Sequence, residues 1–153
     1  MTTQNRSRLG NTVPELLPLI KDARVDADKT RFSMWIPQIS SHFEGSIKPA
    51  EVAILGIESH ICVTQTALDL LAAGHKVYVI ADGVSSSSRH EVPVALARLT
   101  AAGAVVTTSE SWIYECIGDA GIEEFRSIVK LVKETAGDSK ASLQALLGPA
   151  SKI

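Results

Sequence analysis

The stretch over residues 51–63, EVAILGIESHICV, constrains the fold of this chain more than any other. It opens with residues 52–55, a run of small and β-branched apolar side chains that is typical of a strand buried on both faces. After Gly56 the spacing of the apolar residues becomes helical, with one face formed by Val63, Ala67, Leu70 and Leu71. A buried strand followed directly by an amphipathic helix is the repeating unit of a parallel α/β sheet.

The same alternation continues after this helix. Residues 76–81 predict the next strand and residues 104–106 a third, short one. Pairs of capping residues predict helix starts at Thr12 with Glu15, Ser88 with Glu91, and Thr107 with Glu110. Strands and helices alternating at this spacing indicate an α/β fold, in which helices cover both faces of a doubly wound parallel sheet through right-handed crossovers.

Length and composition favour one domain. With 153 residues, 45% of them hydrophobic, the chain can bury a substantial core. We expect the domain to span residues 1–133, ending with an amphipathic helix over 122–133. Residues 134–153 are rich in Gly, Ser and Ala and predict a mobile tail, with a short helix over 142–147 as the alternative.

Charge and cysteine content exclude several classes of protein. The net charge of −2 is spread along the chain, so no basic surface for nucleic acid is expected. No apolar run approaches the ~20 residues of a membrane span. Two cysteines form no secreted disulfide framework, which favours the cytoplasm. The first ten residues contain two arginines and no acid, so a mitochondrial location stays open.

Cys62 is the candidate nucleophile, because it falls at a strand-to-helix turn. With Ser59 as N-cap, the cysteine would lie in the first helical turn, where the helix dipole and free backbone N–H groups stabilise a thiolate. In open α/β sheets, ligands also collect at the carboxyl ends of the strands. The competing interpretation is a small buried core residue, which is the commoner fate of a lone cysteine and the one we expect for Cys116.

Residues 56–71, GIESHICVTQTALDLL, resemble the nucleophile turn of the isochorismatase-like cysteine hydrolases, the superfamily that includes nicotinamidases. The similarity is greatest to the isochorismatase domain-containing proteins of eukaryotes. Further matches occur in the family's order: RLGNTVPEL (8–16), KTRFSM (29–34), the serine-rich loop 82–89 and TTSES (107–111). The resemblance covers residues 2–134 and implies a three-layer, Rossmann-like fold.

The resemblance also implies a mechanism. Cys62 would attack an electrophilic carbon, most simply that of an amide carbonyl, and form a covalent intermediate that water hydrolyses. Lys29 would place an ammonium beside the sulfur and favour the thiolate. The Ile57–Glu58 bond corresponds to the family's cis peptide. The N–H groups of Glu58 and Cys62 would then form an oxyanion hole, worth on the order of 3 kcal/mol per donor in comparable enzymes.

One part of the family's triad has no counterpart here. The general base is an aspartate at the end of the first strand, and this sequence starts where the family's second strand is ending, so we expect the first strand and first helix to be missing. Asp82, after a neighbouring strand, is the best-placed substitute, although an aspartate beside Gly83 and four serines more often fixes a loop. Asp82 and His60 are weak candidates for contacts with substrate. Nothing matches the Asp-x-His metal site of nicotinamidases, so neither metal nor cofactor is expected.

Two functions follow from the sequence. The first is a cysteine hydrolase of a small molecule, inactive in this shortened form. The alternative is a non-catalytic pseudoenzyme that acts as a binding or assembly module. In a third hypothesis, a partner subunit supplies the family's first strand, which is missing here. We expect a small-molecule substrate and, by family habit, a homo-oligomer, but the sequence does not identify the substrate.

Overall fold

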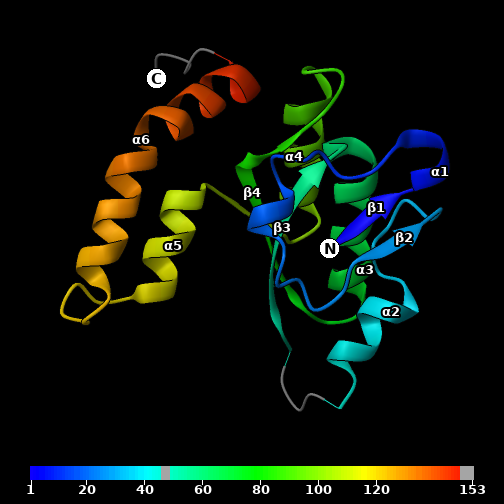
Figure 1. Ribbon diagram of the computed structural model, residues 1–153, viewed down its shortest axis with the longest axis horizontal. Coiled ribbons are helices and arrows are strands. Elements are labelled where there is room, and N and C mark those ends of the chain that lie inside the picture. Colours follow the sequence, from blue (N-terminus) through cyan, green and yellow to red (C-terminus); the bar gives the residue numbers. More distant parts are fainter. Residues whose placement is uncertain (46–48, 149–153) are drawn as a thin grey trace.

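The computed structural model describes residues 1–45 and 49–148, and within them five strands form two parallel sheets (Figure 1). The smaller sheet pairs β1 (Thr2–Gln4) with β2 (Ala27–Lys29). The larger sheet has the order β3-β4-β5, with bounds Glu51–Ile57, Lys76–Ser85 and Val105–Thr107. All three ladders, β1–β2, β3–β4 and β4–β5, are parallel, as the alternation of strands and helices predicts.

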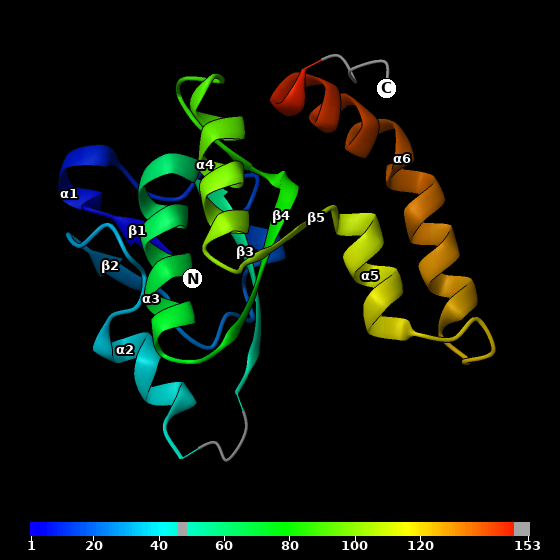
Figure 2. The same ribbon diagram turned by 180° about the vertical axis from the view of Figure 1, so that it is seen from behind.

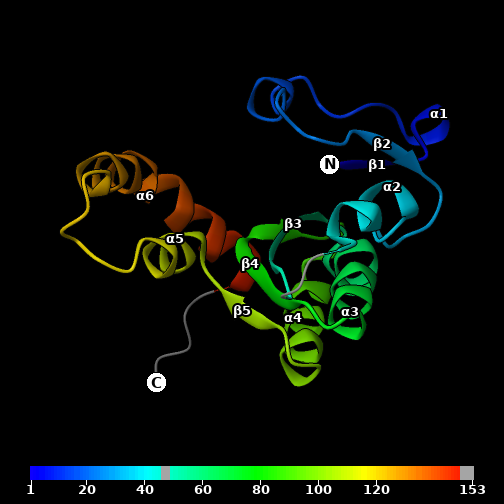
Figure 3. The ribbon, with the colours of Figure 1, turned by 90° about the horizontal axis from the view of Figure 1, so that it is seen from below.

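The helices form layers on the two sides of the larger sheet. One side is covered by α3 (Thr64–Ala72) and α4 (Glu91–Ala101), whereas α5 (Ser109–Ile117) and α6 (Phe125–Leu147) lie on the other side (Figures 2 and 3). The remaining helical segments are α1 (Arg6–Leu9), α2 (Pro37–Ser40), the 3₁₀ turns η1 (Leu17–Leu19) and η2 (Ser41–Phe43), and the π-helical turn η3 (Ser59–Val63). This three-layer arrangement confirms the predicted α/β fold class.

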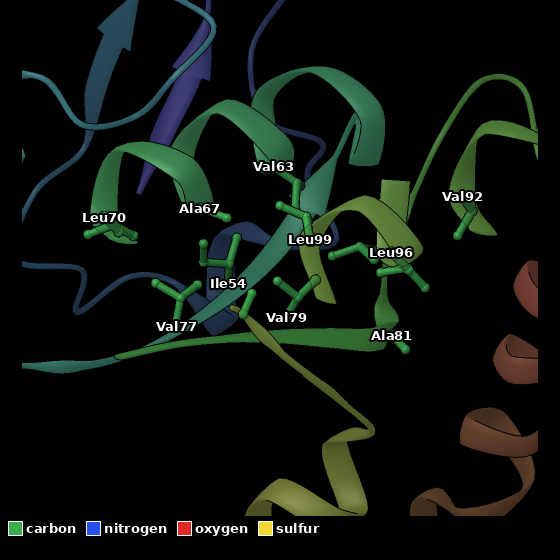
Figure 4. Packing of buried hydrophobic residues seen from close by; sticks show 12 residues of the cluster. Ile54, Val63, Ala67, Leu70, Val77, Val79, Ala81, Val92, Leu96 and Leu99 are labelled. Carbon is green, nitrogen blue, oxygen red and sulfur yellow. The ribbon is translucent and has the colours of Figure 1, made fainter. Parts of the chain in front are cut away.

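The hydrophobic core lies between the larger sheet and the α3–α4 layer (Figure 4). Val79 of β4, Ala67 of α3 and Leu99 of α4 are fully buried there. Burying a side chain of the size of leucine contributes about 1.5–3 kcal/mol. The other members of this cluster are Ile54, Val63, Leu70, Val77, Ala81, Val84, Val92, Leu96 and Ala104.

Strand β3 is an edge strand of this sheet in the described part of the chain. It is longer than predicted and continues past Gly56, which adopts φ +133° at an irregularity in the pairing with β4. The prediction that residues 52–55 form a strand buried on both faces is wrong for Leu55, which is 62% exposed; Ile57, beyond the predicted strand, is 67% exposed.

Three predicted helix starts differ from the structure. Residues 12–16 form no α-helix, and only the 3₁₀ turn η1 follows, because Pro18 cannot donate the backbone hydrogen bond that an α-helix needs. The N-cap of α5 is Thr108 rather than Thr107, and its hydroxyl accepts from the Ser111 N–H at 3.2 Å. Before α4, Ser88 contributes only its backbone carbonyl, which accepts from the Glu91 N–H.

The segment after residue 133 is also different from the prediction of a tail. Helix α6 continues without interruption to Leu147 and includes the alternative helix over 142–147. The physical reason is composition: residues 134–147 contain several strong helix formers, and Gly137, the one glycine among them, costs only ~1 kcal/mol. Residues 149–153 of the expected tail lie outside the described residues. Despite its 23 residues, α6 is not apolar enough to cross a membrane, nor is any other helix in the described part.

Candidate active site

A pocket of about 200 Å³ lies between the smaller sheet and the edge of β3. Gln4, Lys29 and Ile57, at the carboxyl ends of β1, β2 and β3, are among its lining residues, and ligands collect at such strand ends in α/β folds. The two residues predicted to form the catalytic pair, Cys62 and Lys29, both line it. Its other walls come from Met1, Thr2, Gln4, Phe32, Met34, residues 54–57, Val63 and Thr66.

Cys62 lies in the π-helical turn η3, which joins β3 to α3. Cys62 is partly exposed, whereas Ser59 and Val63, at the two ends of the turn, are buried. The prediction that Ser59 caps this helix is wrong: Glu58 precedes the turn, and Ser59 is fully buried with its hydroxyl against that of Ser86. Thr66 fixes the end of the turn, since its hydroxyl donates to the Cys62 carbonyl at 2.6 Å.

Lys29 is the last residue of β2 and is only 8% exposed. Its ammonium donates three hydrogen bonds, at 2.7 Å to Gln4 Oε1, 2.8 Å to the Arg31 carbonyl and 2.9 Å to the Phe32 carbonyl. Burial lowers the pKa of Lys29, whereas the charges of Cys62 and Asp28 act to raise it. The ammonium is therefore held by neutral oxygens and lies close enough to Cys62 to interact with its charge.

Gln4 is a site residue that the sequence analysis missed. Its amide oxygen accepts from Lys29, and its amide nitrogen donates to the Thr30 carbonyl at 2.8 Å, so both ends of the side chain fix the segment that carries the lysine. The sequence offered little signal for this role, because the two partners are 25 residues apart and meet only through the pairing of β1 with β2.

The peptide bond between Ile57 and Glu58 is cis, as the resemblance predicted. The Glu58 carboxylate is directed away from the pocket to the loop after β4, where it accepts from the Ser87 N–H at 2.6 Å and the Ser87 hydroxyl at 3.0 Å. Ile57, on the other side of the cis bond, and Cys62 line the pocket, while the Glu58 side chain anchors the turn to the loop after β4.

The two weaker candidates lie away from the pocket walls. His60 points Nδ1 at the Ser86 hydroxyl, 3.0 Å away. The Asp82 carboxylate accepts from both the backbone N–H and the hydroxyl of Ser109, which fixes the start of α5. Asp82 therefore fixes a loop, which is the commoner role for an aspartate in that setting. Cys116, expected in the core, is exposed on α5, a helix that buries none of its described side chains completely.

Within residues 1–45 and 49–148, no aspartate or glutamate lines the pocket. Lys29 is also the one lysine or arginine side chain among its described walls. The site therefore combines a thiol, a buried ammonium and backbone amides in a mostly apolar setting, without a carboxylate to accept the thiol proton.

Two parallel sheets flanked by helices, with Lys29 at the end of β2 and Cys62 in the turn after β3, place this chain among the α/β proteins. Residues 2–111 match the isochorismatase domain, and the chain belongs to that family. It is 44% identical to the "Secreted isochorismatase effector Isc1" of Phytophthora sojae over 137 residues, which is 88% of this chain and 65% of that protein.

Solved structures agree with this assignment. A structure described as the MAR1 ribonuclease of Caenorhabditis elegans superposes with a TM-score of 0.79 at 36% identity and covers 99% of this chain and 74% of that one. The ycaC gene product of Escherichia coli, described as an octameric hydrolase of unknown specificity, has a TM-score of 0.77 at 22% identity, with coverage of 94% and 71%, and shares the fold. The first curated relatives are longer: the chain spans between 46% and 66% of their lengths.

Proposed function

We propose that this chain carries the nucleophile half of a cysteine hydrolase that acts on a small molecule. The observation that supports this most is the pairing of Cys62 with Lys29 in one pocket, where a buried ammonium held by three neutral oxygens faces a thiol. A buried ammonium is costly unless a negative charge compensates it. A thiolate at Cys62 supplies that charge and is the nucleophilic form of cysteine.

The proposed reaction splits amide hydrolysis into two steps. Cys62 Sγ attacks the carbonyl carbon, and the electron pair of the carbonyl moves to oxygen, where the N–H groups of Glu58 and Cys62 donate to it. The C–N bond then breaks, the amine leaves with a proton and a thioester remains on Cys62. Water attacks the thioester, and the C–S bond breaks to release the acid and the thiol. Lys29 stabilises the sulfur anion at the start and at the end.

The proton transfers need an acid–base group that the described pocket walls do not contain. We propose that an aspartate supplies it from an extended segment paired with the edge of β3 that has no strand partner in the described residues. The exposed Leu55 and Ile57 support this location, because an added strand would cover them and end beside Cys62. The 153-residue chain alone is then expected to form the thioester without rapid turnover.

The experiment uses p-nitrophenyl acetate, an activated ester that needs little acid catalysis. We expect a burst of one equivalent of p-nitrophenolate and an acetyl group on Cys62, located by peptide mass spectrometry. Cys62→Ser should abolish the burst and Lys29→Met should slow it at least tenfold. Cys116 provides the matched control, because it is a free thiol that lies exposed on α5, away from the pocket walls. If Cys62 is acetylated no faster than Cys116, the hydrolase proposal fails.

A second candidate, the non-catalytic binding module, is favoured by the absence of a carboxylate from the described pocket walls. It predicts that small amides raise the melting temperature while Cys62 stays unmodified. Because the nematode neighbour is described as a ribonuclease, a structured RNA belongs in the same assay. Proteins bind the phosphates of RNA mainly through several Lys and Arg side chains, and the described pocket walls contain one, Lys29. We therefore expect no RNA cleavage that depends on Cys62.

We also propose that the chain forms a homo-oligomer. The bacterial neighbour is described as octameric, and α6 keeps none of its side chains fully buried in the described protomer. A helix of this length gains most of its stability from packing, so a second copy against α6 is a physically reasonable partner. Sedimentation velocity tests the proposal, and a folded monomer at micromolar concentration would contradict it.

A further inference from the structure

Ser86 forms an unusually dense set of contacts with the turn that carries Cys62. The serine follows β4, and its hydroxyl accepts from the Ser59 N–H at 3.1 Å. The same oxygen lies 2.5 Å from the Ser59 hydroxyl and 3.0 Å from His60 Nδ1. One side chain thus contacts three polar groups on the first two residues of the π-helical turn.

The hydrogen bonds around Ser86 can be counted. A hydroxyl has one proton and two lone pairs, and the Ser59 N–H takes one lone pair because it can only donate. Of the remaining partners, one must donate to Ser86 and the other accept its proton. Ser59 is fully buried, so its hydroxyl proton is best satisfied by donation to Ser86. Ser86 is then left to donate to His60 Nδ1, an arrangement that requires the ring proton to be on Nε2.

Neighbouring contacts also attach the turn that carries Cys62 to the rest of the fold. Glu58, just before the turn, accepts two hydrogen bonds from Ser87, and the Thr64 hydroxyl donates to the Ser59 carbonyl at 2.7 Å. Three consecutive residues, 58–60, are therefore attached to the loop after β4. The described loop fixes the entry to the turn, and Cys62 follows two residues later.

We propose that Ser86 is a positioning residue of the Cys62 site: its hydroxyl orders the π-helical turn and so holds the thiol at the pocket opposite Lys29. The inference rests on the proposed function for the role of Cys62, but it concerns the geometry of the turn and can be measured without hydrolysis.

The experiment compares alkylation of Cys62 by iodoacetamide in a Cys116→Ser background, where one thiol remains. Ser86→Ala should lower the second-order rate at least fivefold. Ser86→Thr, which keeps the hydroxyl, should restore it to within twofold of the parent. Ser88→Ala is the matched control, because Ser88 is an exposed serine of the same loop, and it should leave the rate unchanged. Alkylation of Ser86→Ala at the parental rate or faster overturns the proposal.

A second readout separates positioning from general stability. Nitrogen-15 NMR of the His60 ring should show the Nε2–H tautomer in the parent and in Ser86→Thr, and a tautomer mixture in Ser86→Ala. If Ser86→Ala does not fold, Ser59→Ala replaces it; that variant removes one of the three contacts and should slow alkylation two- to threefold. An unchanged rate in Ser59→Ala then overturns the proposal.

The outcomes also distinguish the two proposals. In the chain that keeps both cysteines, acetylation of Cys62 no faster than that of Cys116 contradicts the hydrolase, whatever Ser86 does. A reactive Cys62 that is insensitive to Ser86 contradicts only the positioning role.

Discussion

Thr66 provides the sharpest single test of how the site is held together. Its side chain is 2% exposed, and its hydroxyl accepts from the Met34 N–H at 2.9 Å while donating to the Cys62 carbonyl at 2.6 Å. One hydroxyl therefore joins the segment that follows Lys29 to the turn of the nucleophile. Thr66→Val keeps the shape of the side chain and removes both hydrogen bonds.

Two opposing effects decide whether Thr66→Val raises or lowers the free energy of unfolding. Replacing the hydroxyl by a methyl group gains about 1 kcal/mol from apolar burial. The substitution also leaves one donor and one acceptor without their partner, at about 1–3 kcal/mol each. Both of these backbone groups belong to partly exposed residues, so the lower end applies, and the loss is about 2 kcal/mol. The net result is a destabilisation of about 1 kcal/mol, or roughly fivefold in the folding equilibrium.

The assay is urea unfolding followed by tryptophan fluorescence, combined with amide hydrogen exchange. Thr66→Val should lower the midpoint at constant m-value and speed exchange of the Met34 amide. Thr66→Ser, the control, loses a methyl group worth about 1 kcal/mol but keeps the hydroxyl, so the Met34 amide should remain protected. A valine variant as stable as the parent, or one with an equally protected Met34 amide, refutes the reasoning.

Other predictions concern the core, the loop and pH. Leu99→Ala should destabilise by about 3 kcal/mol in urea, because Leu99 is fully buried in the core, and an unchanged midpoint would contradict that assignment. Asp82→Asn should weaken the attachment of α5 by about 1 kcal/mol while leaving the alkylation rate of Cys62 unchanged. Burial lowers the pKa of Lys29 in the folded chain below 10.5, the value expected in the unfolded chain. Just below pH 10.5 the unfolded chain therefore binds more protons than the folded chain, and the free energy of unfolding rises with pH. In Lys29→Met this rise, measured by urea unfolding, should be smaller.

Local sequence patterns predicted the larger sheet and its α3–α4 layer well. The apolar runs before Cys62 and after Gly74 became β3 and β4, and the helical spacing between them became α3. These elements are governed by short-range periodicity and by burial of one face, which a sequence displays directly. The family resemblance located the cis bond and the pocket that contains Cys62 and Lys29, which periodicity alone could not do.

The predictions that were wrong or missing share a cause: the deciding interaction comes from a residue outside the short stretch of sequence that was read. Ser59 has the right residue type for an N-cap, but Ser86, 27 residues away, binds its hydroxyl instead. Gln4 meets Lys29 across the smaller sheet. The exposed end of β3 depends on what lies next to it in space, and the helix expected from Thr12 meets Pro18 before it can complete a second turn.

The two halves of the site lie on different sheets, and this has a consequence for the proposed chemistry. Within the described residues, no backbone ladder joins the sheet that carries Lys29 to the sheet that leads into Cys62. Their relative position depends on side-chain contacts such as the Thr66 link to Met34. A segment paired with the edge of β3 and packed beside β1 would replace these few contacts by continuous hydrogen bonding. The proposed acid-bearing segment would then supply the missing carboxylate and also fix the distance between the thiol and the ammonium.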